Sequence, residues 1–173
     1  TRLTGDLGCV GLPLDRVRSE KFRVDEDSVH SVLPGDVYQK LLELTGNSSF
    51  LTYVTLVATV KICVLKYTSV RTIAIGSPLI KEMDRSGALS IVDKLDEGIS
   101  FRVLLQTVRE TLLQAYRRQH YPLTEIAKDL GLESVENRCP LFDIVVRLDS
   151  VHGDLPALKN DLTFCFTETK EQL

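Results

Sequence analysis

The stretch SFRVLLQTVRETLLQAYRRQHYPLTEI, residues 100–126, decides how the rest of the chain is interpreted. Its first part, 100–119, places apolar side chains three and four residues apart, which is the spacing of an amphipathic helix. The apolar stripe consists of Phe101, Leu104, Leu105, Val108, Leu112 and Tyr116. Ser100 is positioned to cap the start of this helix, and Pro122 cannot continue it.

His120 follows the helix, so this part of the chain is either a catalytic site or a structural corner. The two arginines before His120 disfavour its protonated form, and a neutral histidine at a helix end is usually a surface or capping group. Pro122 explains the end of the periodicity without catalysis, because it forces Tyr121 out of the helical region of backbone conformation. We therefore interpret the segment as a structural corner in which Tyr121 and Leu123 pack into the core.

The first half of the chain predicts one strand and two helices. Residues 21–34 alternate loosely, as expected for a strand with one exposed face. A short helix over 35–46 follows and ends at a glycine. Its buried stripe is expected to consist of Val37, Leu41 and Leu44. Segment 48–68 is apolar almost all round, which indicates a helix buried on several sides at the centre of the domain.

The second half predicts a short helix and further strands. The strand segments are 71–79, a weaker one within 88–98, then 140–149 and 161–169. A short helix over 123–131 follows Pro122. The order of elements predicts an α/β fold in which a mixed β-sheet packs against helices. We expect 1–20 to be a linker or entry segment and 21–173 to be a single domain.

Composition limits the classes of function. The chain has 173 residues, 43% hydrophobic and 26% charged, which is typical of a soluble globular domain. The net charge of −3 and the absence of a basic block argue against nucleic acid as the main partner. No apolar run was expected to span a membrane, and the N-terminal sequence lacks the apolar core of a signal peptide.

The cysteines Cys9, Cys63, Cys139 and Cys165 have no paired spacing, so the sequence predicts no zinc site and reduced thiols in a cytoplasmic protein. Cys63 and Cys165 are expected to be small buried hydrophobic residues. A metal site around His152 and its neighbouring aspartates lacks a recognised ligand spacing, so no metal is predicted.

Four segments resemble, in order, parts of the condensation domains of nonribosomal peptide synthetases. LPLDRVR (12–18) is similar to the Leu-Pro-Thr-Asp-Arg-Pro-Arg linker between the two lobes of that family. Residues 49–79 are similar to the following long helix and strand, including the Gly-Ser-Pro turn. Residues 100–126 resemble the next helix and its His-Gln-Asp-Tyr-Pro-Phe-Glu motif, and NRCPLFDIVV (137–146) resembles the Ser-Arg-Asn-Pro-Leu-Phe motif.

This resemblance implies the C-terminal lobe of the chloramphenicol acetyltransferase-like fold. It assigns structural roles to nine motif residues. They are Gly76, Pro78, Gln119, Tyr121, Pro122, Arg138, Pro140, Leu141 and Phe142. In intact relatives an amine on one carrier protein attacks an acyl thioester on another, so phosphopantetheine on partner carrier proteins is implied, and no cofactor bound to this chain is expected.

The chain also departs from the family pattern. Arg118 lies where the family has the motif histidine, His120 where it has aspartate, and Cys139 where it has asparagine. The Gly-x-Phe-Val-Asn-Thr motif is not found, and we expect the interval between Pro78 and Ser100 to be too short for that family strand and its flanking loop. The catalytic His-His-x-x-x-Asp-Gly pattern is absent, since none of the three histidines has a histidine neighbour.

Five residues are candidates for a substrate or carrier interface. They are Ser77, Arg109, Arg117, Arg118 and His120. Arginines on one helix are suited to an acidic carrier protein or to the phosphate of phosphopantetheine, and the alternative is a solvated helix face. Ser77 as a nucleophile lacks the Gly-x-Ser-x-Gly context, and a strand-ending turn explains its neighbours. No catalytic residue is predicted.

The first interpretation is a non-catalytic, partial condensation-type domain with a structural or docking role in a nonribosomal peptide or hybrid polyketide assembly line. Its expected partners are neighbouring synthetase domains, namely adenylation domain, carrier protein or a missing N-terminal lobe, with self-association through exposed apolar surface. The alternative is the C-terminal half of an active amide-forming condensation domain whose catalytic lobe is not part of this sequence. A third interpretation, an unrelated α/β binding module, requires four ordered resemblances to be accidental.

Overall fold

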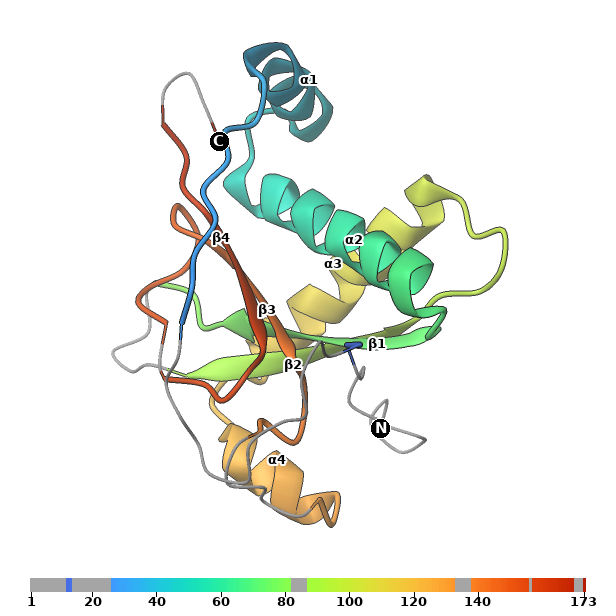
Figure 1. The fold of residues 1–173 in the computed structure, drawn as a ribbon, viewed down its shortest axis with the longest axis vertical. Helices are drawn as coiled ribbons and strands as arrows, with labels where there is room; N and C mark the ends of the chain where they lie inside the picture. Colours follow the sequence, from blue (N-terminus) through green and yellow to red (C-terminus); the bar gives the residue numbers. More distant parts are fainter. Residues whose placement is uncertain (1–11, 14–25, 82–86, 133–137, 156, 170–172) are drawn as a thin grey trace.

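A computed structural model shows a four-stranded mixed sheet with helices on both faces (Figure 1). It describes residues 12–13, 26–81, 87–132, 138–155, 157–169 and 173. Most of the predicted linker 1–20 and the start of the predicted strand 21–34 therefore lie outside the described residues.

The sheet has the strand order β2-β1-β3-β4. Its strands are β1 (Thr72–Pro78), β2 (Ala88–Lys94), β3 (Ile144–Leu148) and β4 (Leu162–Phe166). β1 pairs antiparallel with β2, whereas β3 runs parallel to both β1 and β4. β1 and β3 are paired only at Gly76 and Val145, and Figure 1 shows β3 and β4 running steeply across the direction of β1 and β2. The predicted mixed sheet is confirmed.

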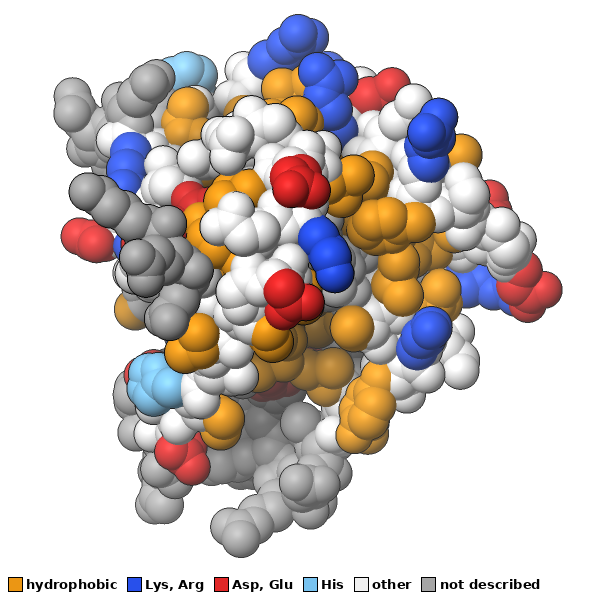
Figure 2. All heavy atoms as spheres, turned by 90° about the horizontal axis from the view of Figure 1, so that it is seen from above, with side chains coloured by type: hydrophobic (Ala, Val, Ile, Leu, Met, Phe, Trp, Pro, Cys, Tyr) orange, Lys and Arg blue, Asp and Glu red, His pale blue; other side chains and the backbone are white. Residues whose placement is uncertain are grey.

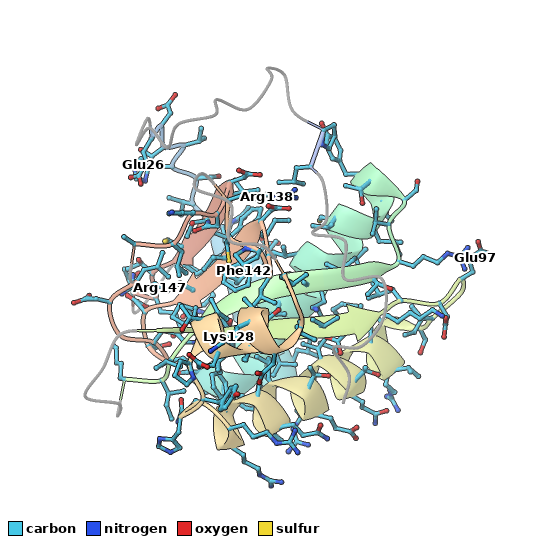
Figure 3. The ribbon with its side chains drawn as sticks, turned by 90° about the horizontal axis from the view of Figure 1, so that it is seen from below. Glu26, Glu97, Lys128, Arg138, Phe142 and Arg147 are labelled. Carbon is cyan, nitrogen blue, oxygen red and sulfur yellow. The ribbon has the colours of Figure 1, made fainter. Side chains whose placement is uncertain are left out.

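Helices cover the two faces of the sheet unequally. They are α1 (Gly35–Thr45), α2 (Ser49–Thr68), α3 (Phe101–Arg117) and α4 (Leu123–Asp129). α2 and α3 lie together over one face, and α4 lies on the opposite face (Figures 1 and 3). α3 begins as predicted, because the Ser100 hydroxyl accepts a hydrogen bond from the Val103 amide at 3.3 Å.

Side chains along the strands alternate between two hydrophobic clusters. On β1, Ile73 and Ile75 face the cluster formed with α2 and α3, and Ala74 faces the cluster on the α4 side. On β3, Ile144 and Val145 divide in the same way. This period of two explains why both faces of the central strands are apolar and why helices are needed on each side.

The weaker strand predicted within 88–98 is confirmed, and it forms β2 at the edge of the sheet. β2 pairs with β1 residue by residue from Lys94, opposite Thr72, to Ala88, opposite Pro78. Leu89 and Ile91 enter the larger cluster, and these contacts hold β2 in register.

The predicted strand over 21–34 is not formed in its described part. Residues 26–34 have no regular secondary structure, and Val29 is 95% exposed. Near the end of this segment the Leu33 amide donates to the Leu173 carbonyl at 2.9 Å, and the Pro34 carbonyl accepts from the amides of Val37 and Tyr38. Alternation alone is weak support for a strand when no neighbouring backbone supplies the ladder of hydrogen bonds.

α1 forms where predicted but buries a different face. Tyr38 and Thr45 are buried, whereas Val37 and Leu44 are exposed and Leu41 is only half-buried. The expected stripe was therefore wrong, because α1 contacts α2 through a face rotated away from its aliphatic residues.

The predictions for the cysteines and for membrane length also need correction. Cys63 and Cys165 are exposed rather than buried, and Cys139 is buried, with all three as free thiols. α2 is long and apolar enough to cross a membrane by length and composition alone, contrary to the expectation that no run approached that length. Its buried residues pack against the sheet and α3, as in the core helix of a globular domain.

Candidate functional site

Four polar side chains meet beyond the point where β1 and β3 separate. Tyr53 comes from α2, Ser77 from the end of β1, Tyr116 from the last turn of α3 and His152 from the turn after β3. Ser77 and His152 are completely buried, and so is Tyr53. We call these four residues the polar cluster.

Hydrogen bonds connect the polar cluster through the Tyr116 hydroxyl. That hydroxyl lies 2.8 Å from Ser77 Oγ and 2.8 Å from His152 Nε2. Ser77 Oγ is 3.5 Å from His152 Nε2 and also donates to the Pro78 carbonyl. The tyrosine hydroxyl is therefore the better partner of both groups, and the direct serine–histidine contact is the weakest.

The cluster replaces backbone pairing that the sheet lacks. Beyond the single β1–β3 pair, the Tyr53 hydroxyl donates to the Val146 carbonyl at 3.0 Å. His152 Nδ1 lies 3.1 Å from the Leu148 amide and 3.0 Å from the Leu148 carbonyl. The ring of His152 also packs edge-on against Tyr53 with 4.3 Å between centroids. Both nitrogens of His152 are thus engaged within the protein.

Burial makes the polar cluster electrically neutral. It lowers the pKa of His152 from 6.5 to about 4, because the charged imidazolium would lose its hydration. Burial likewise raises the pKa of the Tyr53 and Tyr116 hydroxyls. A neutral, enclosed serine and histidine linked through tyrosine form a structural joint between four elements, and Ser77 lacks the exposure that a nucleophile needs.

A second buried polar contact, an ion pair between Lys61 and Asp93, joins α2 to β2. Lys61 and Asp93 are both completely enclosed and their charged atoms are 3.0 Å apart. The lysine Nζ also donates to the carbonyls of Ile73 and Ile91, at 3.0 and 2.7 Å. Thr111 from α3 donates to the Asp93 carboxylate at 2.6 Å. Burial lowers the pKa of Lys61, and the Asp93 carboxylate opposes that change.

The corner at 119–122 is structural, as its proline predicts. Gln119 is buried, and Pro122 lies directly before α4 with extended backbone. Tyr121, which was expected in the core, is instead 48% exposed, and its hydroxyl donates to Asp129 at 2.6 Å. Leu123 does pack against the cluster on the α4 side.

The motif around Arg138 lies directly before β3 and is held by an ion pair. Arg138 forms a two-pronged ion pair with the buried carboxylate of Asp143, at 2.7 and 2.5 Å. This pair precedes β3, which begins at residue 144 rather than 140 as predicted.

The motif residues Leu141 and Phe142 are buried, and a Cβ on Gly76 would lie 2.6 Å from the ring of Phe142. Figure 3 shows Phe142 over the sheet on the side of α4. Pro140 is half-buried and Pro78 buried.

The remaining candidates lie on the surface. Arg109, Arg117, Arg118 and His120 are all exposed, and among the described residues none of them forms an ion pair. The structure therefore does not bring them together with Ser77, which belongs to the enclosed polar cluster.

Sequence reasoning missed Tyr53, Lys61 and Asp93 as functional groups of the interior. A lysine within an otherwise apolar helix is a usable signal, because a buried amine requires a partner. No local signal identified Tyr53 with His152, since the contact joins residues far apart in the sequence. Within the described part of the chain, no group of three or more His, Cys, Asp or Glu residues is arranged to hold a metal.

Comparison with known proteins agrees with this fold. Residues 1–170 match the family described as condensation domain. Bacitracin synthase 3 from Bacillus licheniformis is 27% identical over 159 residues, which are 87% of this chain and 2% of that protein. Bacitracin synthase 2 from the same organism is 28% identical over 161 residues, 87% of this chain and 6% of that protein.

Two solved structures share the architecture. A four-domain nonribosomal peptide synthetase bound to AMP and glycine superposes with a TM-score of 0.78 at 14% identity, over 93% of this chain and 15% of that one. The X-domain from teicoplanin biosynthesis gives 0.77 at 19% identity, over 91% and 41%. The predicted α/β lobe is confirmed, and the chain spans only a small part of the curated relatives that it matches.

Proposed function

This chain belongs to the condensation-domain family, and within that family we propose for it a structural and docking function without independent catalysis. The place of that function is an assembly line for nonribosomal peptides or peptide–polyketide hybrids. Relatives of this chain are synthetases of that kind, including bacitracin synthase 3. As the C-terminal lobe, it would form one wall of a reaction channel and part of the surface that meets other domains.

The observation that carries this proposal is the state of the three histidines. His152 is completely buried, with its two ring nitrogens engaged by Tyr116 and by the backbone of Leu148. His30 and His120 are exposed and lie outside the polar cluster. A general base needs a suitable pKa and reach to the proton that it removes. None of these histidines combines a polarising partner with access to a substrate.

Neighbouring synthetase domains are the proposed partners, in the form of an adenylation domain, a carrier protein with phosphopantetheine, or an N-terminal lobe. The X-domain has been solved in a complex with OxyB, which is a case of this fold binding another protein. We place the chain in the cytoplasm, where its exposed thiols at Cys63 and Cys165 would stay reduced. Exposed Val32 and Leu44 would allow self-association of the isolated lobe.

A condensation assay tests the proposal. The purified chain is mixed with one carrier protein loaded with an acyl group and another loaded with an amino acid, and products are measured by mass spectrometry. We expect no product above a blank without the chain, and an intact condensation domain that accepts the same carriers serves as the positive control. Product above the blank would overturn the proposal, and comparison of His120→Ala with His152→Ala would then locate the base.

The second candidate is the C-terminal half of an active amide-forming condensation domain. The well-packed interior favours it, because the Lys61–Asp93 pair, the Arg138–Asp143 pair and the polar cluster are all formed in this chain. Addition of a separately produced lobe carrying His-His-x-x-x-Asp-Gly distinguishes the two. Product that forms only in the mixture supports this second candidate, whereas its absence supports the structural role, provided that light scattering shows the lobes associated.

A further inference from the structure

One exposed ridge of α3 combines charge with an apolar centre. Arg109, Leu113 and Arg117 follow one another at four-residue spacing and therefore lie along the same side of the helix. The two arginines are exposed and Leu113 is half-buried between them. Eight residues of helix separate the arginines by roughly 12 Å along its axis. We call these three residues the α3 ridge.

The charge of the α3 ridge contrasts with that of the whole chain. α3 contains Arg102, Arg109 and Arg117 but a single acidic residue, Glu110, whereas the chain has a net charge of −3. Within the described ranges, the three arginines of α3 form no ion pair. Arg109 is thus available to a partner, and Arg117, in the last turn of α3, also suits the negative end of the helix dipole. Figure 2 shows basic side chains at the upper margin of the face seen from above and others spread across that face among apolar and acidic ones.

The helix that carries the ridge is held firmly at its inner face. Leu104, Val108 and Leu112 are buried in the larger hydrophobic cluster. Near the C-terminal end, the Tyr116 hydroxyl is bonded to Ser77 and His152. The backbone of the ridge is thus already ordered before binding, so only its side chains lose conformational freedom, which reduces the cost of association.

We propose that the α3 ridge docks an acidic helix of a partner protein, with an apolar residue of that helix packed on Leu113 and a carboxylate paired with each flanking arginine. This inference deepens the proposed docking function and rests on it. A helix with an acidic, an apolar and an acidic residue at four-residue spacing matches the ridge in both charge and distance. A nucleic acid is a poorer match, because a leucine occupies the centre of the ridge and the chain as a whole is negative.

Binding measurements with two probes test this proposal. The first probe is a stapled helical peptide with Glu, Leu and Glu at four-residue spacing, and the second is an acidic carrier protein without phosphopantetheine. Fluorescence anisotropy is measured at low and high salt. We expect Arg109→Glu with Arg117→Glu to weaken both probes by about tenfold or more, and Leu113→Ala to weaken them without changing the salt dependence.

Matched controls separate the ridge from general charge effects. Lys40→Glu with Lys66→Glu makes the same change of net charge at exposed positions of α1 and α2, and should leave binding unchanged. A peptide with Lys in place of Glu should bind the double arginine variant better than the native chain. Circular dichroism must show native helix content in each variant, and Arg109→Lys with Arg117→Lys should keep part of the affinity.

The outcomes distinguish this inference from the proposed function. The proposal for the α3 ridge would be overturned if the acidic peptide bound the native chain and the double arginine variant equally well. It would also be overturned if the lysine control variant lost as much peptide affinity as the double arginine variant. Loss of peptide binding on addition of inorganic phosphate at constant ionic strength would also overturn it, by indicating a simple anion site. Peptide binding at the ridge without binding of any carrier protein would support the recognition of acidic helices and contradict the carrier docking that belongs to the proposed function.

Discussion

Gly76 shows how one residue of a strand can be fixed by a neighbour. The glycine lies near the end of β1 at its single pairing position with β3, and the ring of Phe142 lies directly against it. A Cβ at this position would approach the ring atoms to 2.6–2.9 Å. The absence of a side chain on Gly76 therefore allows the Phe142 ring to pack directly on β1, on the side of the sheet that α4 covers.

We predict that Gly76→Ala lowers the free energy of unfolding by about 1–3 kcal/mol, because Phe142 must move within a packed core. Urea denaturation measures the change. Gly35→Ala is the matched control, since a Cβ there meets nothing within 4 Å and the residue begins α1, so we expect a change within about 0.5 kcal/mol. A second change, Phe142→Leu in the Gly76→Ala background, should recover part of the loss. Equal stability of Gly76→Ala and the native chain would contradict this account of the contact.

Lys61 shows how much the sequence around a single residue can predict about its contacts. An amine in the middle of the apolar helix α2 implies a buried acceptor, but the sequence does not say which acidic residue supplies it. The structure selects Asp93, thirty-two positions later on β2, and adds Thr111 from α3. Partner choice depends on the register of β2 against β1, which is a property of the folded sheet.

At the scale of elements, the existence of helix α1 was predicted correctly, but the side of the helix that is buried was not. Its bounds were predicted well because turn residues mark both ends, and Gly46 adopts the left-handed conformation after the last turn. Its buried side was predicted incorrectly, since Tyr38 packs inward and Leu44 faces solvent. The position of α1 against the rest of the fold, rather than its aliphatic stripe, therefore decides which of its side chains are enclosed.

Substitutions on the two sides of α1 test this orientation. We predict that Tyr38→Ala costs about 3 kcal/mol of stability, because a side chain with 4% exposure is removed from a packed site. Leu44→Glu should change stability by less than about 0.5 kcal/mol, since 64% of that residue is exposed. Chemical denaturation of both variants is sufficient. A larger loss of stability in Leu44→Glu than in Tyr38→Ala would instead support burial of the aliphatic stripe, as first expected.

The elements that sequence predicts best are those whose signals are local. α3 has a cap, a regular stripe and a proline after its end, and the structure reproduces it from 101 to 117. The strand predicted at 21–34 rested on alternation alone, and its described part is irregular. β2 was predicted only weakly, because the pairing with β1 that stabilises it is not a local signal. Long-range pairing is therefore the information that local patterns lack.

For the molecule as a whole, the polar cluster could not be predicted because it is assembled from four distant segments. The Tyr53 hydroxyl reaches a carbonyl 93 residues later in the chain, and Tyr116 reaches His152 across 36 residues. Ser77 was predicted as a candidate for a substrate or carrier interface, and the structure encloses it near the junction of β1 and β3, within hydrogen-bond distance of Tyr116. Arg109, Arg117 and Arg118 were predicted individually, whereas the lack of an ion pair to any of them among the described residues became visible only in three dimensions.

Burial of His152 makes the stability of the whole molecule sensitive to acid. In the unfolded chain the imidazole binds a proton near its ordinary pKa of 6.5, whereas burial holds the pKa in the folded protein at about 4. The nearby charges of Arg147 and Lys81 act in the same direction. Since the unfolded state binds the proton first as pH falls, this contribution is complete above pH 6.5 and is lost progressively towards pH 4.

We predict a loss of about 3 kcal/mol from this group between pH 7.5 and pH 4, equivalent to its shift in pKa. Urea denaturation across that range measures the total, and the imidazole resonances of His152 in NMR spectra give its own titration in the folded protein. His120→Gln, at an exposed site outside the polar cluster, is the control substitution. His152→Gln should flatten it, because the variant has no proton to bind, even if its stability at pH 7.5 is lower. A His152 resonance that titrates near 6.5 while the chain stays folded would mean that the cluster opens to water, and the rigid support inferred for α3 would then lose one of its attachments.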